Sequence, residues 1–197
     1  MSKSPVKVRK DSSASKVKEG PFLSEDSRHL YLMRHGKAQK SKKTDHDVFR
    51  SLDRRGCRDV KKIRKLMRDR RLQPDLILCS PAVRTMETLM KLKKIFTRAE
   101  IVFMDALYMA DADEMLQILR RTGSDKYDVL VIGHNPGLQE FLPLICDWDL
   151  TREDPHQHRI ADGFPTSALA CLEVPEGWQK LGNKPVQLTE FIYSSDL

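Results

Sequence analysis

The sequence predicts an α/β fold of three layers, in which helices cover both faces of a mostly parallel central sheet. Short apolar runs around residues 31–33, 76–78 and 129–132 each stop at polar residues or glycine, and each is followed by a helical pattern. A repeated order of strand, loop and helix is typical of parallel sheets. Because the carboxyl ends of such strands share one edge of the sheet, we expect the functional residues there.

Length and composition indicate one domain. The chain has 197 residues, of which 40% are hydrophobic, and a single core fits this size. No apolar run approaches the roughly 18 residues that span a membrane, and the amino terminus lacks the apolar stretch of a secretory signal. We expect an intracellular, cytoplasmic protein that binds no membrane, with the nucleus and organelles left open.

The cysteines are widely scattered, at Cys57, Cys79, Cys146 and Cys171. No two of them have the close spacing of a metal clip or a redox motif. In an intracellular protein such residues are reduced thiols, mostly in or near the core. We therefore expect no disulfide.

The amino-terminal tail, residues 1–27, is basic and has almost no large apolar side chains. Residues 1–20 hold six Lys or Arg against Asp11 and Glu19, so this stretch contributes +4 to the net charge of +7. A segment that can bury so little cannot offset its ordering entropy, and we expect it to be disordered. Nuclear targeting, an organelle presequence and docking to an acidic partner stay open. The folded domain then spans residues 28–197.

The first apolar run ends at Arg34-His35-Gly36. A buried strand that ends in such a pair presents both side chains at the sheet edge. Gly36 lets the backbone turn and approach a ligand closely. A neutral histidine can attack phosphorus through a ring nitrogen. The tripeptide indicates an anion site, although an incidental charged pair is the alternative for so short a motif.

Residues 39–50 are polar and irregular, and we expect them to loop over the mouth of this site. Residues 52–72 show a helical pattern whose apolar face holds Val60, Ile63, Leu66 and Met67. The rest of this helix is densely basic, with Arg54, Arg55, Arg58, Lys61, Lys62, Arg64, Lys65, Arg68, Arg70 and Arg71. We interpret this surface as solvated, or as a binding surface for an acidic protein. Nucleic acid is not expected, because no aromatic residue interleaves the charges as a stacking platform.

The second apolar run is followed by Ser80 and Pro81, and it leads straight into a helix. Ser80 suits the N-cap and Pro81 the first helical position, so the unpaired amides of the first turn can face an anion. Arg84 lies in or just beyond that turn, where it can swing back to the end of the strand. The buried face of this helix is expected to hold Ala82, Met86, Leu89 and Phe96.

Two further strands are expected, at residues 100–104 and 127–132, with a short helix at residues 113–121 between them. The second of these strands ends in Gly133-His134-Asn135, again just before a helix start. Three strand ends in one chain thus carry cationic or hydrogen-bonding side chains. Such convergence is hard to obtain by chance.

Together the motifs resemble those of the histidine phosphatase superfamily, which includes the phosphoglycerate mutases. They are Arg34-His35-Gly36, Ser80-Pro81-Ala82 with Arg84, and Gly133-His134-Asn135-Pro136. Within the superfamily the sequence is similar to the small SixA-type phosphohistidine phosphatases. Supporting matches lie at residues 52–56, 107–108 and 164–168, and the last of these leads into a final strand and Trp178. The resemblance spans about residues 28–193.

The resemblance implies a catalytic domain over residues 28–197 in which His35 is the phosphorylated nucleophile. No metal and no cofactor is implied. The other implied catalytic residues are Arg34, Arg84 and His134. To these we add Gly36, Ser80 and Asn135 as substrate-binding residues.

The residue types make chemical sense in these roles. Two guanidiniums can clamp the equatorial phosphoryl oxygens, and their positive field favours neutral His35 over its imidazolium form. His134 as a donor would neutralise charge as the phosphoryl group flattens. Water would then hydrolyse the phosphohistidine.

The sequence departs from the pattern of the superfamily at the residue that would donate a proton to the leaving group. In many members of the superfamily a glutamate after the third strand has this role, and Tyr108 stands at the expected position here. A tyrosine with a pKa of about 10 is a poor acid at neutral pH. A phosphoramidate can instead leave as a neutral amine or imidazole once solvent protonates its nitrogen. An error of register would make Asp105, Asp111 or Asp113 the acid.

We therefore predict a phosphatase that acts through a phosphohistidine intermediate and hydrolyses phosphohistidine, or a related phosphoramidate, on protein. The alternatives are a phosphomonoesterase acting on a small metabolite or a phosphoprotein, and a scaffold that binds phosphate without turnover. The expected partner is thus a phosphorylated protein or a small phosphorylated molecule.

Residues 147–163 form a polar stretch with a set of side chains that resemble loose metal ligands, Asp154, His156, His158 and Asp162. Their spacing fixes no metal geometry. We interpret the stretch as a solvated loop, or as a segment that rims the pocket. No metal site is predicted.

Overall fold

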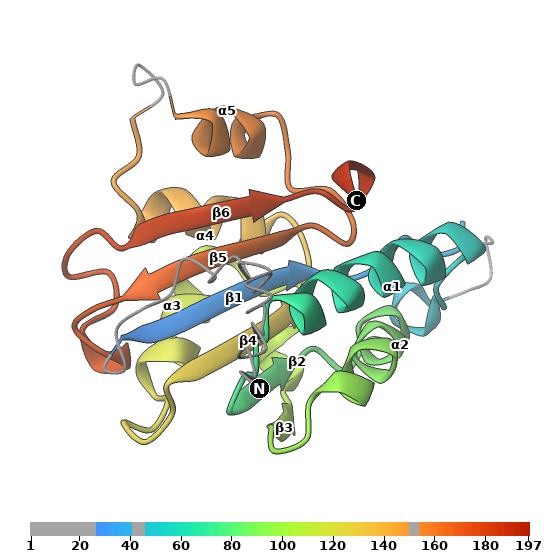
Figure 1. Cartoon of the computed structure of the whole chain (residues 1–197), viewed down its shortest axis with the longest axis horizontal. Coiled ribbons are helices and arrows are strands. Elements are labelled where there is room, and N and C mark those ends of the chain that lie inside the picture. The colour runs from blue at the N-terminus through green and yellow to red at the C-terminus, as the bar shows by residue number, and fades with distance from the viewer. Residues whose placement is uncertain (1–26, 41–45, 150–153) are drawn as a thin grey trace, which may run out of the picture.

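The computed structural model describes residues 27–40, 46–149 and 154–197. The predicted tail, apart from Ser27, lies outside the described residues, so its disorder stays a prediction. The described residues form a six-stranded sheet with helices packed against it (Figure 1). None of these helices combines the length and the apolar character that a membrane span needs.

The strand order of the sheet is β3-β2-β4-β1-β5-β6. Four strands are mutually parallel: β1 (Arg28–Arg34), β2 (Leu76–Cys79), β3 (Glu100–Phe103) and β4 (Asp128–Gly133). The other two strands are antiparallel to their neighbours in the sheet. β5 (Leu169–Val174) is antiparallel to β1, and β6 (Gln187–Ile192) is antiparallel to β5. The prediction of a mostly parallel sheet is confirmed, whereas the single final strand of the prediction is in fact an antiparallel pair.

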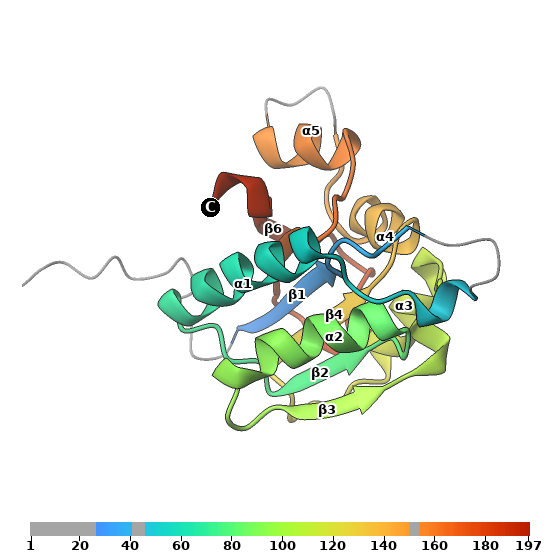
Figure 2. The same ribbon diagram turned by 90° about the vertical axis from the view of Figure 1, so that its right-hand side faces the viewer.

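Helices cover both faces of the sheet, which confirms the three-layer prediction. One face carries α1 (Arg54–Asp69) and α2 (Val83–Leu92), which lie side by side (Figure 2). The other face carries α3 (Ala112–Arg120), α4 (Gly137–Ile145) and α5 (Pro155–Ala161).

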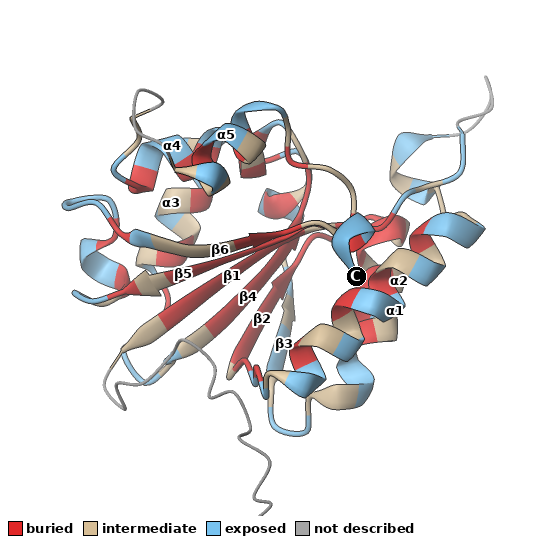
Figure 3. Ribbon diagram, turned by 45° about the horizontal axis from the view of Figure 1, so that its top comes forward, coloured by how far each residue is buried: buried red, intermediate tan, exposed pale blue. Residues whose placement is uncertain are grey.

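The alternation of side chains along β1 explains why both faces are covered. Leu30 and Leu32 pack with α3 and α4, whereas Tyr31 and Met33 pack with α1 and α2. Successive side chains of a strand point to opposite faces, so a run that is apolar at every position belongs inside a sheet covered on both sides. The central strands are accordingly buried along most of their length (Figure 3). All four cysteines are free thiols, and three of them are buried.

α1 is shorter than the predicted helix at both ends. Its start is set by Asp53, whose side chain accepts a hydrogen bond from the Gly56 N–H at 2.6 Å and so caps the helix. Three residues of the predicted apolar face, Val60, Ile63 and Met67, are buried. The fourth, Leu66, is only partly buried at the margin of this face.

The predicted start of α2 is wrong, and its predicted buried face is correct for Ala82 and Leu89 but not for Met86 and Phe96. The helix begins at Val83 with Ala82 as the N-cap, so Ser80 does not cap it. The hydroxyl of Ser80 lies 2.8 Å from Nε2 of His134 instead, and Pro81 and Ala82 complete the turn out of β2. Met86 and Phe96 are only partly buried, and the buried residues of the helix are Arg84, Thr85, Thr88, Leu89 and Leu92.

The interpretation of residues 147–163 as a solvated loop is wrong for its second half, which forms α5. The side chain of Asp154 caps this helix by accepting from the His156 N–H at 2.8 Å, and Pro155 occupies its first turn. Ile160 anchors the helix in the core.

Candidate active site

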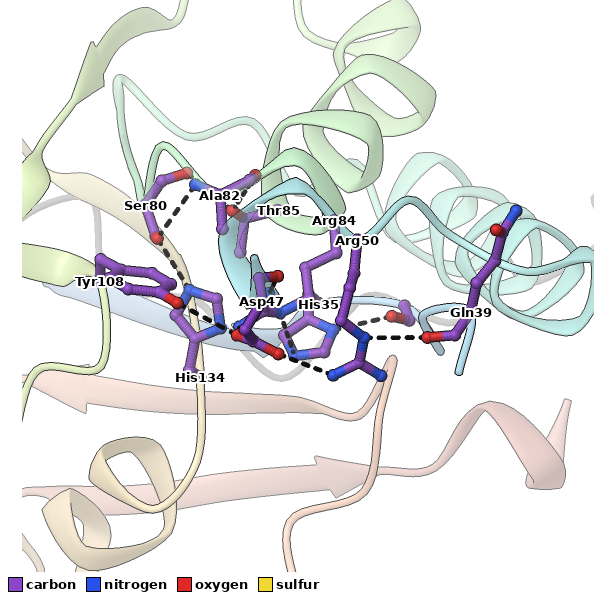
Figure 4. Close-up of polar contacts among 11 residues, drawn as sticks. His35, Gln39, Asp47, Arg50, Ser80, Ala82, Arg84, Thr85, Tyr108 and His134 are labelled. Carbon is purple, nitrogen blue, oxygen red and sulfur yellow. Dashed lines mark hydrogen bonds and ion pairs between the residues drawn. The ribbon is translucent and has the colours of Figure 1, made fainter. Parts of the chain in front are cut away.

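Three strand ends place the predicted site residues at one edge of the sheet. In the parallel register Arg34 of β1 pairs with Gly133 of β4, and Cys79 of β2 pairs with Ile132 of β4. The residues that follow these strands therefore emerge next to one another, and they are His35, Ser80 and His134. The ring centroids of the two histidines are 5.1 Å apart (Figure 4).

His35 is buried, and its two ring nitrogens have different partners. Nδ1 lies 2.8 Å from the main-chain oxygen of Gly36, so this nitrogen carries a proton and donates it. Nε2 keeps its lone pair, which accepts a hydrogen bond from Nε of Arg84 at 3.3 Å. Burial, and then the charges of Arg84, Arg34 and Arg50, lower the pKa of His35 to about 4 despite the hydrogen bond to Gly36. The imidazole is therefore neutral at neutral pH, as a nucleophile must be.

Gly36 is required by packing. A Cβ atom at this position would lie 2.9 Å from Cγ2 of Val60 and 3.1 Å from the main-chain oxygen of Gly56. The Gly36 N–H donates to Oγ1 of Thr88 at 3.0 Å. The loop after β1 is thus held directly against α1 and α2, which fixes the position of His35. The predicted contact of Gly36 with substrate stays a prediction.

Arg84 is the second residue of α2, and its guanidinium reaches back to the strand ends. Nε faces His35, and both Nη groups contact Asp47. Nη1 donates to the main-chain oxygen of Asp47 at 2.8 Å, and Nη2 lies 2.9 Å from its Oδ2. The guanidinium carbon is 5.9 Å from the ring centroid of Tyr108.

Arg34 lies at the junction of two cavities. It lines one of about 480 Å³ together with His35 and Arg84, and a neighbouring one of about 490 Å³ with Asn135. Its Nη1 donates to the main-chain oxygen of Phe164 at 2.8 Å. Burial, and then the charge of Arg84, lower the pKa of Arg34. Two guanidiniums therefore meet at the cavity that holds His35.

His134 follows β4 and lines the same cavity. Its Nε2 lies 2.8 Å from Oγ of Ser80, and its Nδ1 is buried without a hydrogen-bond partner among the described residues. Burial, followed by the charges of Arg84 and His35, lowers the pKa of His134 to about 3. His134 is therefore neutral at neutral pH. Ser80 orients it and has this role in place of the predicted helix cap.

Asn135 ties together the loops around the cavity. Its Nδ2 donates to the main-chain oxygen of Phe164 at 3.1 Å and lies 3.2 Å from Oε1 of Gln139. Arg34 donates to the same Phe164 oxygen. The end of β1 and the loop after β4 thus share one partner in the segment before β5. The predicted contact of Asn135 with substrate stays a prediction.

Asp47 was not predicted as a site residue, but it lies in the polar network of the site (Figure 4). Its carboxylate contacts Arg84, Nη1 of Arg50 at 2.8 Å and the hydroxyl of Tyr108 at 3.1 Å. The hydrogen bond from Arg50, assisted by the charge of Arg84, lowers the pKa of Asp47 to about 2 against the opposing effect of partial burial. The only signal in the sequence was that Asp47 belongs to the segment predicted to loop over the mouth.

Tyr108 lies in the site, at the position predicted for a proton donor. Its ring packs edge-on against that of His134, with centroids 5.5 Å apart. The acids considered as replacements do not line the cavity. Asp111 caps α3 by accepting from the Glu114 N–H, and Asp105 and Asp113 are exposed. The alternative register therefore finds no support.

The cavity is strongly electropositive. Its described lining has one carboxylate, that of Asp47, against five cationic side chains, Arg34, Lys37, Lys40, Arg50 and Arg84. A concave surface lined by one sign of charge attracts ligands of the opposite sign. The arrangement therefore suits a phosphoryl group. Arg34 and Arg84 were predicted as site residues, whereas Lys37, Lys40 and Arg50 were not.

The polar stretch before β5 rims the neighbouring cavity. Arg159 of α5, together with Asp162 and Gly163 after it, contributes to the lining. This cavity shares Arg34 and Asn135 with the one that holds His35. The second interpretation of this stretch, as a rim, thus fits the described residues.

The residues that resembled loose metal ligands have other partners. Asp154 caps α5, and Nδ1 of His156 accepts from the Phe191 N–H at 3.3 Å. Within residues 27–40, 46–149 and 154–197, no group of three or more His, Cys, Asp or Glu side chains is arranged to hold a metal ion.

Comparison with known proteins identifies the family. The profile of the histidine phosphatase superfamily (branch 1) matches residues 30–115. The uncharacterized protein ML1117 of Mycobacterium leprae is 30% identical over 147 residues, which cover 75% of this chain and 87% of that protein. The uncharacterized chloroplastic protein At3g52155 of Arabidopsis thaliana is 29% identical over 167 residues, which cover 79% of this chain and 77% of that protein.

Two solved structures are similar along most of the chain, and both carry a provisional assignment as the phosphohistidine phosphatase SixA. The one from Agrobacterium tumefaciens is 30% identical with a TM-score of 0.70, over 84% of this chain and 97% of that chain. The one from Nakamurella multipartitia is 26% identical with a TM-score of 0.73, over 85% of this chain and 96% of that chain. The chain therefore belongs to the histidine phosphatase superfamily as a SixA-like member, and it is a phosphatase with a histidine nucleophile.

Proposed function

We propose that the protein hydrolyses phosphohistidine, or a related phosphoramidate on a protein, through a covalent intermediate on His35. The observation that carries the proposal is the neutral, buried His35, whose Nε2 faces Nε of Arg84 at 3.3 Å in a cavity lined by five cationic side chains. The provisional assignment of two similar structures as phosphohistidine phosphatases supports the substrate class.

In the first step, Nε2 of His35 attacks the phosphorus atom with its lone pair. A P–N bond forms to Nε2 while the bond from phosphorus to the protonated leaving nitrogen breaks, and the leaving imidazole or amine departs neutral. Donation from Nδ1 to the Gly36 oxygen holds the ring in the required tautomer and stabilises the positive charge that develops on it.

Arg84 and Arg34 stabilise the phosphoryl group during its transfer. Their planar guanidiniums hold its equatorial oxygens through charged hydrogen bonds. His134, oriented by the hydroxyl of Ser80, adds a hydrogen-bond donor as the transferring group flattens. Phosphoryl transfer through a loose transition state needs little beyond such positioning and charge neutralisation.

The leaving group distinguishes a phosphoramidate from an alkyl phosphate ester. Asp47 is the carboxylate that lines the cavity in the described part of the chain, and its pKa of about 2 keeps it ionised at neutral pH. An ionised carboxylate cannot supply the proton that an alkoxide needs. The nitrogen of a phosphohistidine can take its proton from solvent, so the site favours phosphoramidates.

Water completes the cycle in a second step. Its oxygen attacks phosphorus, the P–N bond to His35 breaks, and Nε2 recovers its lone pair. The phosphate leaves with both protons of the water and then equilibrates with solvent, so His35 returns to its neutral form with the proton on Nδ1.

Trapping of the intermediate tests the proposal. With radiolabelled phosphohistidine as substrate, acid-labile phosphate should appear on the protein during turnover, and His35→Ala should abolish both turnover and labelling. His156→Ala is the matched control, because His156 lies on α5 and does not line the cavity. Labelling that survives in His35→Ala would place the nucleophile elsewhere. Phosphate binding without label or turnover would indicate a scaffold.

A substrate panel tests the leaving-group argument. Phosphohistidine and phospholysine should exceed phosphotyrosine and phosphoglycerate in kcat/KM by about a hundredfold or more, the factor commonly attributed to a general acid. Faster turnover of phosphoglycerate than of phosphohistidine would favour the phosphomonoesterase alternative.

A further inference from the structure

We infer that Asp47 is a positioning residue that acts through Arg84, because it holds the guanidinium with its Nε edge toward His35. The inference rests on the proposed function, since it takes His35 as the nucleophile and Arg84 as a ligand of the phosphoryl group. It gives a role to the one acidic side chain in the described lining of the cavity.

The contacts of Arg84 divide its guanidinium into two edges. The end edge is taken by Asp47, whose main-chain oxygen accepts from Nη1 at 2.8 Å and whose Oδ2 lies 2.9 Å from Nη2. The other edge begins at Nε, which is 3.3 Å from Nε2 of His35. Each Nη group carries two N–H bonds, so Nη2 keeps one beside Nε. The Nε–H of this edge donates to the lone pair of His35, so a phosphoryl oxygen that binds the edge replaces this hydrogen bond and frees the lone pair for attack. Asp47 stays in place during this exchange.

Asp47 is itself held from two further directions. Its Oδ1 accepts from Nη1 of Arg50 at 2.8 Å, and Nε of Arg50 donates to the main-chain oxygen of Gln39 at 2.9 Å. Its Oδ2 also accepts from the hydroxyl of Tyr108 at 3.1 Å. The carboxylate is thus fixed although its side chain is 47% exposed. In this arrangement Tyr108 orients the carboxylate of Asp47 and need not act as an acid.

The burial of Arg84 explains why this support matters. Its side chain is only 4% exposed, and Asp47 is the carboxylate paired with it among the described residues. A buried guanidinium without a counterion bears a large desolvation cost and would turn toward solvent. Asp47 supplies the countercharge at the edge away from His35, so the edge that faces His35 can exchange its hydrogen bond with His35 for one with substrate.

A carboxylate in an anion site can also have the opposite role, in which it competes with the substrate for the cation. A carboxylate that occupied the phosphate position on Arg84 would have to leave before substrate binds, and its removal would strengthen anion binding. The two roles therefore predict opposite changes in the affinity for orthovanadate, an anion that mimics the transferring phosphoryl group.

The experiment compares Asp47→Ala and Asp47→Asn with Asp105→Asn, each in the wild-type protein and in an Arg84→Ala background. Asp105 is the matched control, because it is an exposed acid of the neighbouring segment Asp105–Leu107 and does not line the cavity. The readouts are kcat and KM with phosphohistidine, and the dissociation constant of orthovanadate by calorimetry, which needs no turnover. Thermal unfolding checks that each variant folds.

Asp47→Ala should lower kcat/KM and weaken orthovanadate binding by about ten- to a hundredfold, as expected for the loss of a charged hydrogen bond that acts in the transition state. Asp47→Asn keeps an acceptor for Arg84 and should recover to within about fivefold of the wild type. Arg84→Ala alone should cost about a hundredfold or more. In that background Asp47→Ala should change either readout by less than about twofold, because the two residues act as a unit.

Three results would overturn the inference. Tighter orthovanadate binding by Asp47→Ala would make Asp47 a competitor, and an undiminished effect of Asp47→Ala without Arg84 would separate the two residues. An equal loss of kcat/KM and of orthovanadate affinity in Asp105→Asn would show that the effect comes from the change in net charge and not from the contact with Arg84. If the wild-type protein binds orthovanadate but turns over no phosphoramidate, the proposed function fails, and the binding measurements still decide the role of Asp47.

Discussion

At the scale of single residues, the two histidines of the site are kept neutral by their position. Burial is the largest of the causes that lower the pKa of His35 to about 4 and that of His134 to about 3, and the charge of Arg84 adds to it in both cases. In the mechanism that we propose, the cations that bind the phosphoryl group also keep the nucleophile unprotonated. One set of charges would then serve both substrate binding and activation of His35.

The low pKa of His35 predicts a loss of stability in mild acid. In the unfolded chain its pKa is about 6.5, so below this pH protons bind the unfolded state, whereas folded His35 stays neutral until about pH 4. Stability is therefore lost as the pH falls from 6.5 toward 4. At pH 5 the loss from His35 alone is about 2 kcal/mol.

The variant His35→Asn removes this proton uptake and measures the effect. Between pH 7 and pH 5 its free energy of unfolding in urea should fall by roughly 2 kcal/mol less than that of the wild type. Any difference between the two proteins at pH 7 cancels in this comparison. Equal losses in both proteins would show that His35 titrates in the folded state as it does in the unfolded chain.

The candidate catalytic residues could be predicted from the sequence because each follows or begins an element with a clear pattern. Arg34 and His35 end one apolar run, and His134 ends another. Asp47 could not be predicted, since it lies in a segment without a periodic pattern, and the two partners that tie it to the site, Arg84 and Tyr108, are far away in sequence. Arg84 is 37 residues from it and Tyr108 is 61 residues from it. No local pattern encodes contacts of this kind.

At the scale of elements, the strands with a clear local pattern in the sequence were predicted, and β6, which has no such pattern, was not. β1, β2 and β4 are buried on both faces and appear in the sequence as apolar runs. β6 lies at the edge of the sheet, is mostly part-exposed and has no apolar run, so it gave no signal. α5 is short and buries only Gln157 and Ile160, too few positions to show a helical period.

The contact between α1 and the loop after β1 is set at Gly56. A Cβ atom there would lie 2.2 Å from the main-chain oxygen and 2.6 Å from the main-chain nitrogen of Lys37. Both are backbone atoms, so either the helix or the loop must shift. Gly56→Ala should therefore lower the free energy of unfolding by about 1–3 kcal/mol. Because Lys37 follows His35 and Gly36 directly, kcat/KM should fall as well.

Gly133→Ala is the matched control for this prediction. It also precedes a histidine of the site, but the nearest atoms to its Cβ would be side-chain carbons of Leu138 at 3.8 Å, an ordinary contact. Its stability should change by less than about 1 kcal/mol. Thermal unfolding and turnover of phosphohistidine measure both variants. If Gly56→Ala behaves like Gly133→Ala in both assays, the packing argument for Gly56 is wrong.

At the scale of the whole molecule, positive charge is gathered in three places. Residues 1–20 contribute +4 of the net +7, the described lining of the cavity has five cations, and α1 has exposed arginines and lysines along its length. A phosphorylated protein brings negative charge, and complementary fields raise association rates. We propose an acidic protein as the partner of α1 and the tail. Nucleic acid is disfavoured, because α1 has no aromatic residue on which a base could stack.

Deletion of residues 1–20 tests whether the tail is separate from the catalytic domain that we propose for residues 28–197. Tm and turnover of a small phosphoramidate should stay unchanged, because this composition offers little apolar surface to bury. Binding of an acidic partner should weaken, and the loss should shrink as salt rises, since exposed charges are screened beyond about 8–10 Å at physiological ionic strength. A full-length variant with the six Lys and Arg of residues 1–20 changed to Gln separates charge from length. A fall of several degrees in Tm on deletion would show that the tail packs against the domain, whereas lost localisation at unchanged Tm would assign it to targeting.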